Sequence, residues 1–144
     1  TVTDTFIENR HRVQPNHANN LGSVHGGYVM MWLDEVGAMS AGRFAGEPCV
    51  TAMVNRLSFE RPIPTGHIVV IQSYVYATGR TSVKVRLKAL RENPRTGEQQ
   101  RTTESHFVFV AVDSDGSPTE VPELAVETER DQALREAALE NDGE

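Results

Sequence analysis

The chain has 144 residues, of which 38% are hydrophobic and 24% charged, a composition that indicates one folded domain and excludes a fully disordered chain. Its 20 acidic and 14 basic residues give a net charge of −6, which argues against a general nucleic-acid binder. A single cysteine, Cys49, excludes an internal disulfide, and no apolar run approaches the roughly 20 residues that span a membrane. We therefore expect a cytoplasmic protein without a membrane or nucleic-acid partner.

The first part of the chain predicts one strand and one buried helix. Residues 6–13 have strand character, and the polar, turn-rich residues 14–27 separate them from the helical residues 28–44. The helical segment is hydrophobic on nearly all sides, which is typical of a helix that other elements enclose. The rest of the chain must therefore cover this helix.

Four strands are predicted next, because the hydrophobic period changes to two. They cover residues 50–60, 67–78, 80–90 and 101–112. In the first of them, Met53, Leu57 and Phe59 share one face. Short turns join the strands, which favours antiparallel pairing. A curved antiparallel sheet wrapped around the long central helix covers it most simply, and this α+β architecture is the hotdog fold.

The acidity of the chain lies at its end. Residues 120–144 hold nine acidic residues and two arginines, a net charge of −7, whereas residues 1–119 have a net charge of +1. A charged helix with a narrow apolar stripe is predicted past Pro122, so we divide the chain into a domain, 1–122, and a tail, 123–144. The tail is either solvated and frayed or packed on a neighbouring subunit.

Two glycines, Gly26 and Gly27, stand at the entry to the predicted helix. The first N–H groups of a helix have no partner within it and lie at the positive end of its dipole, so they can bind a developing oxyanion. Without a Cβ atom, the glycines let an acyl carbonyl come close. A tight loop that leads into a packed helix explains the same pair.

Asp34 is the candidate general base. It lies between Leu33 and Glu35 in a helix that we expect to be enclosed, and carboxylates are almost never buried without a partner. A carboxylate at the edge of an apolar site can take a proton from water. The alternative is a hydrated stripe of the helix, and the pattern does not separate Asp34 from Glu35.

The turn at residues 78–82 is a candidate phosphate site. It offers the guanidinium group of Arg80 and the hydroxyl groups of Thr81 and Ser82, and Arg56 adds positive charge from a neighbouring strand. An ordinary hairpin and a surface ion pair are the structural alternatives. The histidines and the single cysteine show no metal-binding spacing, so no metal site is predicted.

In this order, the segments resemble the acyl-CoA thioesterase branch of the hotdog superfamily, which includes the YciA-type enzymes and the brain-type acyl-CoA hydrolases. The segments that match read PNHANNLGSVHGG, WLDEVGA, VTAMVNRLSFERPIPTG, GRTS and FVFVAVDSDGSP. The resemblance covers residues 6–122 and leaves the acidic tail outside it.

The resemblance implies a role for each candidate. Asp34 takes the place of the family's catalytic carboxylate, and Gly26 and Gly27 that of the amide groups that polarise the carbonyl. Asn19 takes the place of the asparagine that helps to hold the water or the thioester, although the neighbouring Asn20 leaves this alignment uncertain by one residue.

The resemblance also implies a substrate and an assembly. Arg80, Thr81 and Ser82 would approach the phosphates of coenzyme A, which enters as part of an acyl-CoA substrate and leaves as a product, without a further cofactor. The family builds its site between two protomers of a homodimer, so Asn19 and Asp34 would come from different subunits. Such dimers commonly assemble into trimers of dimers.

Two other functions fit the sequence. A hotdog hydratase or dehydratase of acyl thioesters would pair a histidine with a carboxylate, and His25 near the helix entry is the candidate. A non-catalytic acyl-CoA-binding module would bind the thioester without releasing a thiol. Since His25 stands where YciA-type proteins often have phenylalanine, the preferred acyl length stays open.

Overall fold

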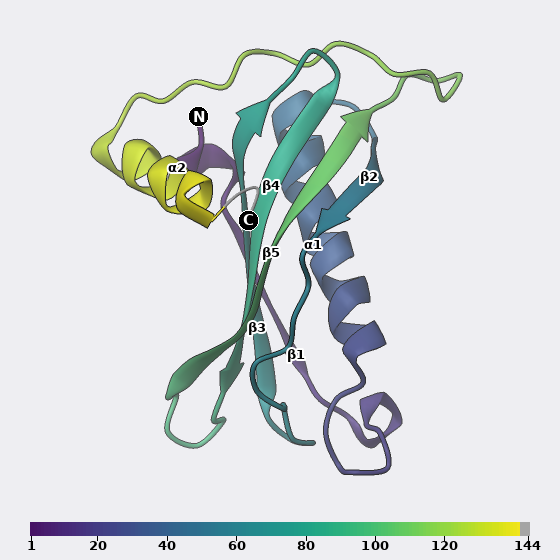
Figure 1. Cartoon of the computed structure of the whole chain (residues 1–144), viewed down its shortest axis with the longest axis vertical. Coiled ribbons are helices and arrows are strands. Elements are labelled where there is room, and N and C mark those ends of the chain that lie inside the picture. Colours follow the sequence, from purple (N-terminus) through teal and green to yellow (C-terminus); the bar gives the residue numbers. More distant parts are fainter. Residues whose placement is uncertain (142–144) are drawn as a thin grey trace.

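The computed structural model describes residues 1–141 and shows a curved antiparallel sheet with one helix on each face (Figure 1). The strands are β1 (Ile7–Arg12), β2 (Cys49–Asn55), β3 (Ile68–Thr78), β4 (Ser82–Glu92) and β5 (Gln99–Ala111), and the helices are α1 (Gly26–Ala45) and α2 (Glu129–Asn141). The strand order is β1-β3-β4-β5-β2, which leaves β1 and β2 as the two edges. The predicted α+β architecture is confirmed.

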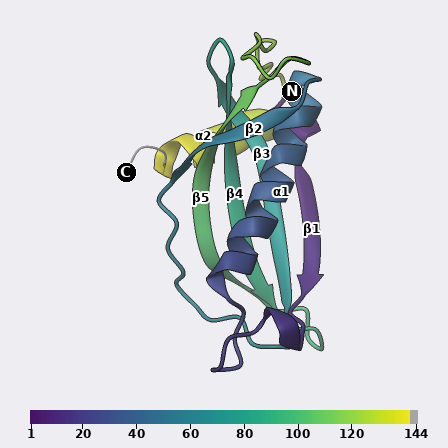
Figure 2. The same ribbon diagram turned by 90° about the vertical axis from the view of Figure 1, so that its right-hand side faces the viewer.

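Helix α1 packs along one face of the sheet (Figure 2). Leu33 and Val36 are fully buried against inward-facing residues of the strands, among them Leu87 and Phe109. A Cβ atom at Gly37 would lie 3.0 Å from the side chains of Leu87 and Phe109, so the helix comes as close to the sheet as a glycine allows. Burial of this apolar stripe stabilises the helix more than its intrinsic propensity does.

One chain does not enclose α1, which corrects the expectation from the sequence. Met30, Met31 and Met39 on the helix remain 42–48% exposed, because the sheet covers only one side of it. The helix also begins at Gly26, two residues before the predicted start. An exposed apolar helix face of this kind is typical of an interaction surface.

Strand β2 ends at Asn55, five residues before the predicted end. The period-two pattern continues past it, and Leu57 still packs against the core. Arg56, however, has a φ of 44°, a left-handed conformation that interrupts the strand ladder. The segment from Arg56 onward therefore runs beside β5 without belonging to the sheet.

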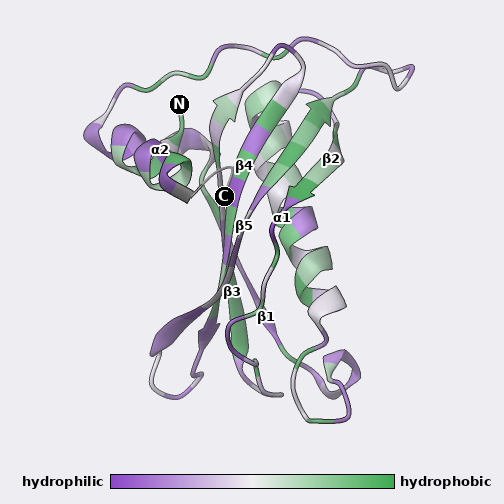
Figure 3. Cartoon of the chain, viewed as in Figure 1, coloured by the Kyte–Doolittle hydropathy of each residue, from purple (hydrophilic) through white to green (hydrophobic). Residues whose placement is uncertain are grey.

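The predicted C-terminal helix is confirmed as α2, which packs on the outer face of the sheet of its own chain instead of fraying. Tyr74 Oη donates a hydrogen bond of 2.6 Å to the carbonyl of Leu134, and His106 Nε2 lies 3.0 Å from the carbonyl of Ala138. The helix is mostly hydrophilic, whereas β2 is hydrophobic (Figure 3). The boundary between domain and tail at residue 122 stays a prediction.

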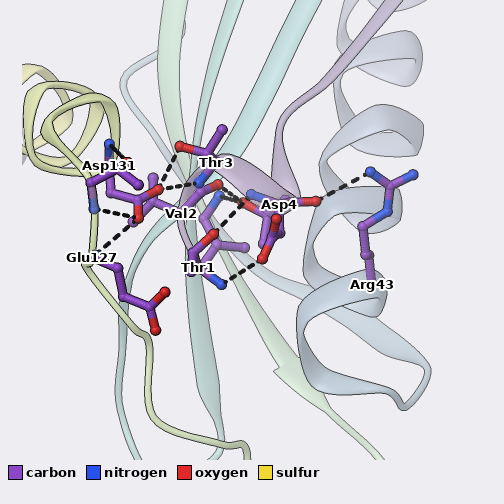
Figure 4. Close-up of polar contacts among 10 residues, drawn as sticks. Thr1, Val2, Thr3, Asp4, Arg43, Glu127 and Asp131 are labelled. Atoms are coloured by element: carbon purple, nitrogen blue, oxygen red, sulfur yellow. Dashed lines mark hydrogen bonds and ion pairs between the residues drawn. The ribbon is translucent and has the colours of Figure 1, made fainter.

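The carboxylate of Asp131 connects the start of α2 to the first residues of the chain (Figure 4). It is completely buried and accepts hydrogen bonds from the backbone N–H of Thr3 (2.7 Å), its hydroxyl (2.5 Å), and the N–H groups of Glu127 (3.0 Å) and Thr128 (3.2 Å). These donors, the Thr3 hydroxyl first, hold the pKa of the Asp131 carboxyl far below its usual range.

Candidate functional site

Asp34 lies in the middle of α1, partly buried, on the side of the helix that faces β2. The hydroxyl of Thr51 on β2 donates a hydrogen bond to its Oδ1 atom. Within residues 1–141 Asp34 makes no ion pair, so its carboxylate is oriented by a neutral donor and is not neutralised by a cation. Such a carboxylate keeps a lone pair with which it can accept a proton.

Thr51 is a candidate site residue that the sequence analysis missed. It lies in a strand of seven residues next to a bulge between Thr51 and Met53, and nothing in the local pattern distinguishes it from the other exposed residues of β2. Only the packing of β2 beside α1 brings its hydroxyl to Asp34.

An apolar surface lies beside Asp34, and we call it the open face. It consists of Met30, Met31 and Met39 of α1 and Val50, Met53 and Val54 of β2, which are 39–55% exposed. Met30 lies one helical turn before Asp34, so the two side chains share a stripe of the helix. The candidate base is therefore at the edge of a surface that a single chain leaves uncovered.

Asn19 lies in the loop before α1, partly buried, whereas Asn20 is exposed. Its Oδ1 atom accepts hydrogen bonds from the N–H groups of Leu21 (2.9 Å) and Ser23 (3.2 Å), which fixes the side chain. The amide Nδ2 has no acceptor among residues 1–141 and is available to a ligand. This arrangement favours Asn19 over Asn20.

The two glycines face different spaces. A Cβ atom at Gly26 would lie 3.2 Å from the ring of Phe59, whereas one at Gly27 would meet no atom within 4 Å. Gly26 and Asn19 line one cavity of about 270 Å³, and Gly27 lines another of about 320 Å³ together with His25 and Met31. The first glycine allows close packing against Phe59 and the second leaves open space, and their role in admitting an acyl carbonyl stays a prediction.

Within one chain the structure does not bring Asn19 and the glycines to Asp34. Asp34 follows Gly26 by eight residues, which is about 12 Å along the helix axis. His25 precedes Asp34 by nine residues, or about 13 Å, so the histidine and carboxylate of a hydratase do not meet in one chain either.

The turn with Arg80, Thr81 and Ser82 lies at the other end of the sheet. Its backbone joins the strand ends there: the Ala111 N–H donates a 3.0 Å hydrogen bond to the carbonyl of Thr81. Helix α1 ends on this side and begins about 30 Å away, given its 20 residues. Arg80 forms an exposed ion pair with Glu120 at 3.5 Å, and in the single chain the turn connects β3 and β4 as a hairpin.

Arg56 does not join this turn. It lines a separate cavity of about 190 Å³ together with Arg101, Glu104 and His106 near the end of β2. Arg56 and Arg80 are exposed and Thr81 and Ser82 are partly buried, and the chain places the two arginines apart.

Two histidines pack around Trp32 on the side of α1 near β1. The ring of His11 stacks on the indole at 4.6 Å with an interplanar angle of 2°, and His17 meets it edge-on at 5.1 Å. Burial lowers the pKa of His11, opposed by Glu35 and assisted by His17. Among residues 1–141 no group of three or more His, Cys, Asp or Glu side chains is placed to hold a metal ion, and no helix is long and apolar enough to cross a membrane.

Residues 21–98 match the sequence profile of the Thioesterase superfamily. An uncharacterized acyl-CoA thioester hydrolase of Bacillus subtilis, YkhA, is 35% identical over 133 residues, which are 92% of this chain and 77% of that protein. A solved hexameric acyl-CoA thioesterase without ligand is 34% identical with a TM-score of 0.87, over 96% of this chain and 89% of that one.

An acyl-CoA hydrolase from Staphylococcus aureus, solved with butyryl coenzyme A and coenzyme A, is 26% identical with a TM-score of 0.87, over 96% of this chain and 85% of that one. Three further structures of it, 25% identical to this chain, carry alanine in place of an aspartate, an asparagine or a threonine. In that protein the asparagine precedes the aspartate by 15 residues, and the threonine follows the aspartate by 17.

Proposed function

The chain belongs to the thioesterase superfamily and is a hotdog-fold hydrolase of acyl-CoA thioesters, and we propose that Asp34 of one protomer and Asn19, Gly26 and Gly27 of its partner carry out this reaction. The observation that carries the proposal is the carboxylate of Asp34, which is oriented by Thr51 and lies without a counter-cation at the edge of the open face.

The open face supports a two-fold dimer as the unit that completes the site. The apolar residues of α1 and of the edge strand β2 lie on one surface, which a second copy of the chain would bury. If the α1 helices pack antiparallel about an axis near Met30, Asp34 stands opposite Gly26 of the partner subunit, because the two residues lie four positions on either side of Met30. Asp34 and Gly26 are about 12 Å apart along the helix axis within one chain, but in this dimer Asp34 of one protomer would contact the start of α1 of its partner.

Spacing along the chain supports the same residues. Asn19 precedes Asp34 by 15 residues and Thr51 follows it by 17, which are the intervals between the three residues replaced in the Staphylococcus aureus enzyme. The hydrogen bond between Thr51 and Asp34 gives the threonine a physical role. We infer that these three residues form the hydrolytic site here.

The reaction follows from these positions. Asp34 accepts a proton from water, and the oxygen of the water attacks the carbonyl carbon of the thioester. The N–H groups at the start of the partner's α1 stabilise the oxyanion, while the amide of Asn19 of the partner subunit holds the water or the carbonyl. The C–S bond then breaks, the proton passes from Asp34 to the leaving sulfur, and coenzyme A and a carboxylic acid are released.

The turn with Arg80, Thr81 and Ser82 is proposed to contact the phosphates of coenzyme A. It lies beyond the end of α1 at Ala45, about 16 Å along the axis from Asp34, a span that the extended arm of coenzyme A can bridge. Arg56 would reach the same phosphates only from another protomer. The hexamers among the similar structures support assembly of the dimers into a trimer of dimers, and the single free cysteine is in line with a cytoplasmic location.

Release of coenzyme A thiol from butyryl-CoA tests the assignment. Asp34→Asn keeps the size of the side chain and removes the base, so turnover should fall by roughly 10²- to 10⁴-fold. Glu35→Gln changes the neighbouring exposed carboxylate and should leave turnover within about twofold. Near-normal turnover by Asp34→Asn, or loss in both variants alike, contradicts the role of Asp34.

A further inference from the structure

The cavity beside Gly26 is formed by two segments that are held together by backbone hydrogen bonds. The N–H of Val24 donates to the carbonyl of Ile63 at 2.8 Å, and the N–H of Thr65 donates to the carbonyl of Gly22 at 3.0 Å. These bonds connect the loop before α1 to the segment after β2. The cavity is therefore built into the single chain rather than formed by a ligand.

Phe59 forms one wall of this cavity, and its backbone is fixed on both sides. The hydroxyl of Thr103 donates to the carbonyl of Ser58, and the N–H of Glu60 donates to the carbonyl of Thr102 at 2.7 Å. Thr102 and Thr103 belong to β5 and are completely buried. Since β5 anchors both neighbours of Phe59, the aromatic ring is the part of this wall that can move.

The ring of Phe59 lies against the first residue of α1. A Cβ atom at Gly26 would be 3.2 Å from its Cε2 atom and 3.4 Å from its Cζ atom. The ring is nevertheless 45% exposed, so much of its apolar surface has no cover in the single chain. A ligand whose carbonyl binds at the start of α1 would meet this ring with the atoms that follow the carbonyl.

The lining of the cavity indicates the chemistry of that ligand. Val24, Pro62 and Ile63 join Phe59 as apolar walls. Polar atoms come from Asn19 and Ser23 and from Glu60 and Arg61, which form an exposed ion pair at 3.8 Å. Because the walls are mainly apolar, the pocket suits a hydrocarbon chain attached to a carbonyl.

We propose that this cavity receives the acyl group of the substrate and that Phe59 limits the size of the acyl group that fits. This proposal rests on the proposed function, because it takes the thioester carbonyl to lie at Gly26. With the ring in place, the pocket accepts short acyl groups, and longer chains meet the ring. Phe59 is thus a specificity-determining residue that touches the substrate without taking part in proton transfer.

The test compares kcat/KM for acetyl-, butyryl-, hexanoyl- and decanoyl-CoA. Because one methylene group in an apolar pocket changes specificity by about 10-fold or more, Phe59→Ala should raise the ratio of decanoyl-CoA to butyryl-CoA by about 10-fold or more. Phe59→Trp should lower the same ratio. Leu139→Ala, which truncates a side chain that is 40% exposed on α2, is the matched control and should leave the profile unchanged.

The outcomes separate this proposal from the proposed function. If Phe59→Ala hydrolyses butyryl-CoA with an unchanged profile, the reaction stands and the role of Phe59 is wrong. If it raises KM equally for every chain and weakens inhibition by free coenzyme A, the ring contacts the coenzyme A part, which also overturns the proposal. Calorimetric binding of the same acyl-CoAs to Asp34→Asn, with and without Phe59→Ala, repeats the comparison without turnover and so tests the pocket even if the assignment of the base fails.

Discussion

The hydroxyl of Thr51 on the edge strand β2 donates a hydrogen bond to the carboxylate of Asp34 in the middle of α1. The two residues are 17 positions apart in the chain, and the turn around Gly46 brings them together by reversing the direction of the backbone. This contact connects the helix that carries the candidate base to the strand that carries the open face. Substitutions on the open face near Thr51 should therefore alter the orientation of the Asp34 carboxylate.

Thr51→Val should lower kcat for butyryl-CoA and change KM little. Valine keeps the shape of threonine but cannot donate, so Asp34 loses the group that orients it. A hydrogen bond to a charged group contributes about 1.5–3 kcal/mol, which corresponds to a loss of about 10-fold or more. Thr51→Ser keeps the donor and should retain most of the activity. Equal activity of the valine and serine variants would show that the hydroxyl does not assist the base.

Asp131→Asn should release α2 from the sheet without unfolding the domain. The buried carboxylate accepts hydrogen bonds from Thr3, Glu127 and Thr128, and the amide replaces an acceptor by a donor that faces those N–H groups. Faster hydrogen exchange in α2 than in β4 would report this release. Glu140→Gln, an exposed acid on the same helix, should leave exchange unchanged.

The same carboxylate makes the docking of α2 sensitive to acid. Its pKa is lowered by folding, so its contribution to stability is complete above the pKa of the unfolded state, about 3.9, and is lost as the pH falls below that value. In the natural sequence, the protection of the α2 amides from hydrogen exchange should therefore decline as the pH falls below about 4. Asp131→Asn should lack this decline, and an equal decline in the variant would assign it to other groups.

His11 predicts a second dependence of stability on pH, in a higher range. Burial lowers the pKa of His11 beside Trp32, so the unfolded chain binds a proton more readily. Stability from this residue is complete above the unfolded pKa of about 6.5 and declines as the pH falls below it. His11→Phe keeps a ring on Trp32 without the proton, so its urea midpoint should fall less between pH 8 and pH 5.5. An identical fall in both proteins would contradict this.

The central elements could be predicted from the sequence because their patterns are local. Helix α1 is apolar over more than four turns, and β4 alternates buried and partly exposed residues over much of its length, interrupted by the buried Arg86. The candidate residues Asp34, Gly26 and Asn19 could be named because the short segments that contain them match those of a known family in order and spacing.

The remaining features depend on contacts between segments that are distant in the sequence. No local pattern tells that the hydroxyl of Thr51 reaches α1, or that Asp131 binds Thr3 across 128 positions. The alternation through Leu57 and Phe59 predicted a longer strand, but Arg56 has a positive φ. Hydroxyl groups of β5 bind the carbonyls of Asn55 and Ser58 on either side of it, and these are contacts that the local pattern does not reveal. The apolar residues of α1 predicted an enclosed helix, whereas the sheet of the single chain covers only one side of it, because hydrophobicity does not tell which element or chain supplies the cover.

Mixing two inactive variants tests most directly whether the site is shared between protomers. Asp34→Asn and Asn19→Ala are each expected to lack turnover, since each damages both sites of a homodimer. After joint refolding in equal amounts, half of the dimers contain one copy of each variant. One of the two sites in such a dimer then combines an intact Asp34 with an intact Asn19.

The shared site predicts that the mixture recovers about a quarter of the thiol release of the natural sequence from butyryl-CoA, because a two-fold dimer has two equivalent sites. The double variant Asn19→Ala, Asp34→Asn, refolded with the natural sequence, should give mixed dimers without any intact site. A mixture of the single variants that stays as inactive as its components, although mixed dimers have formed, would contradict the account.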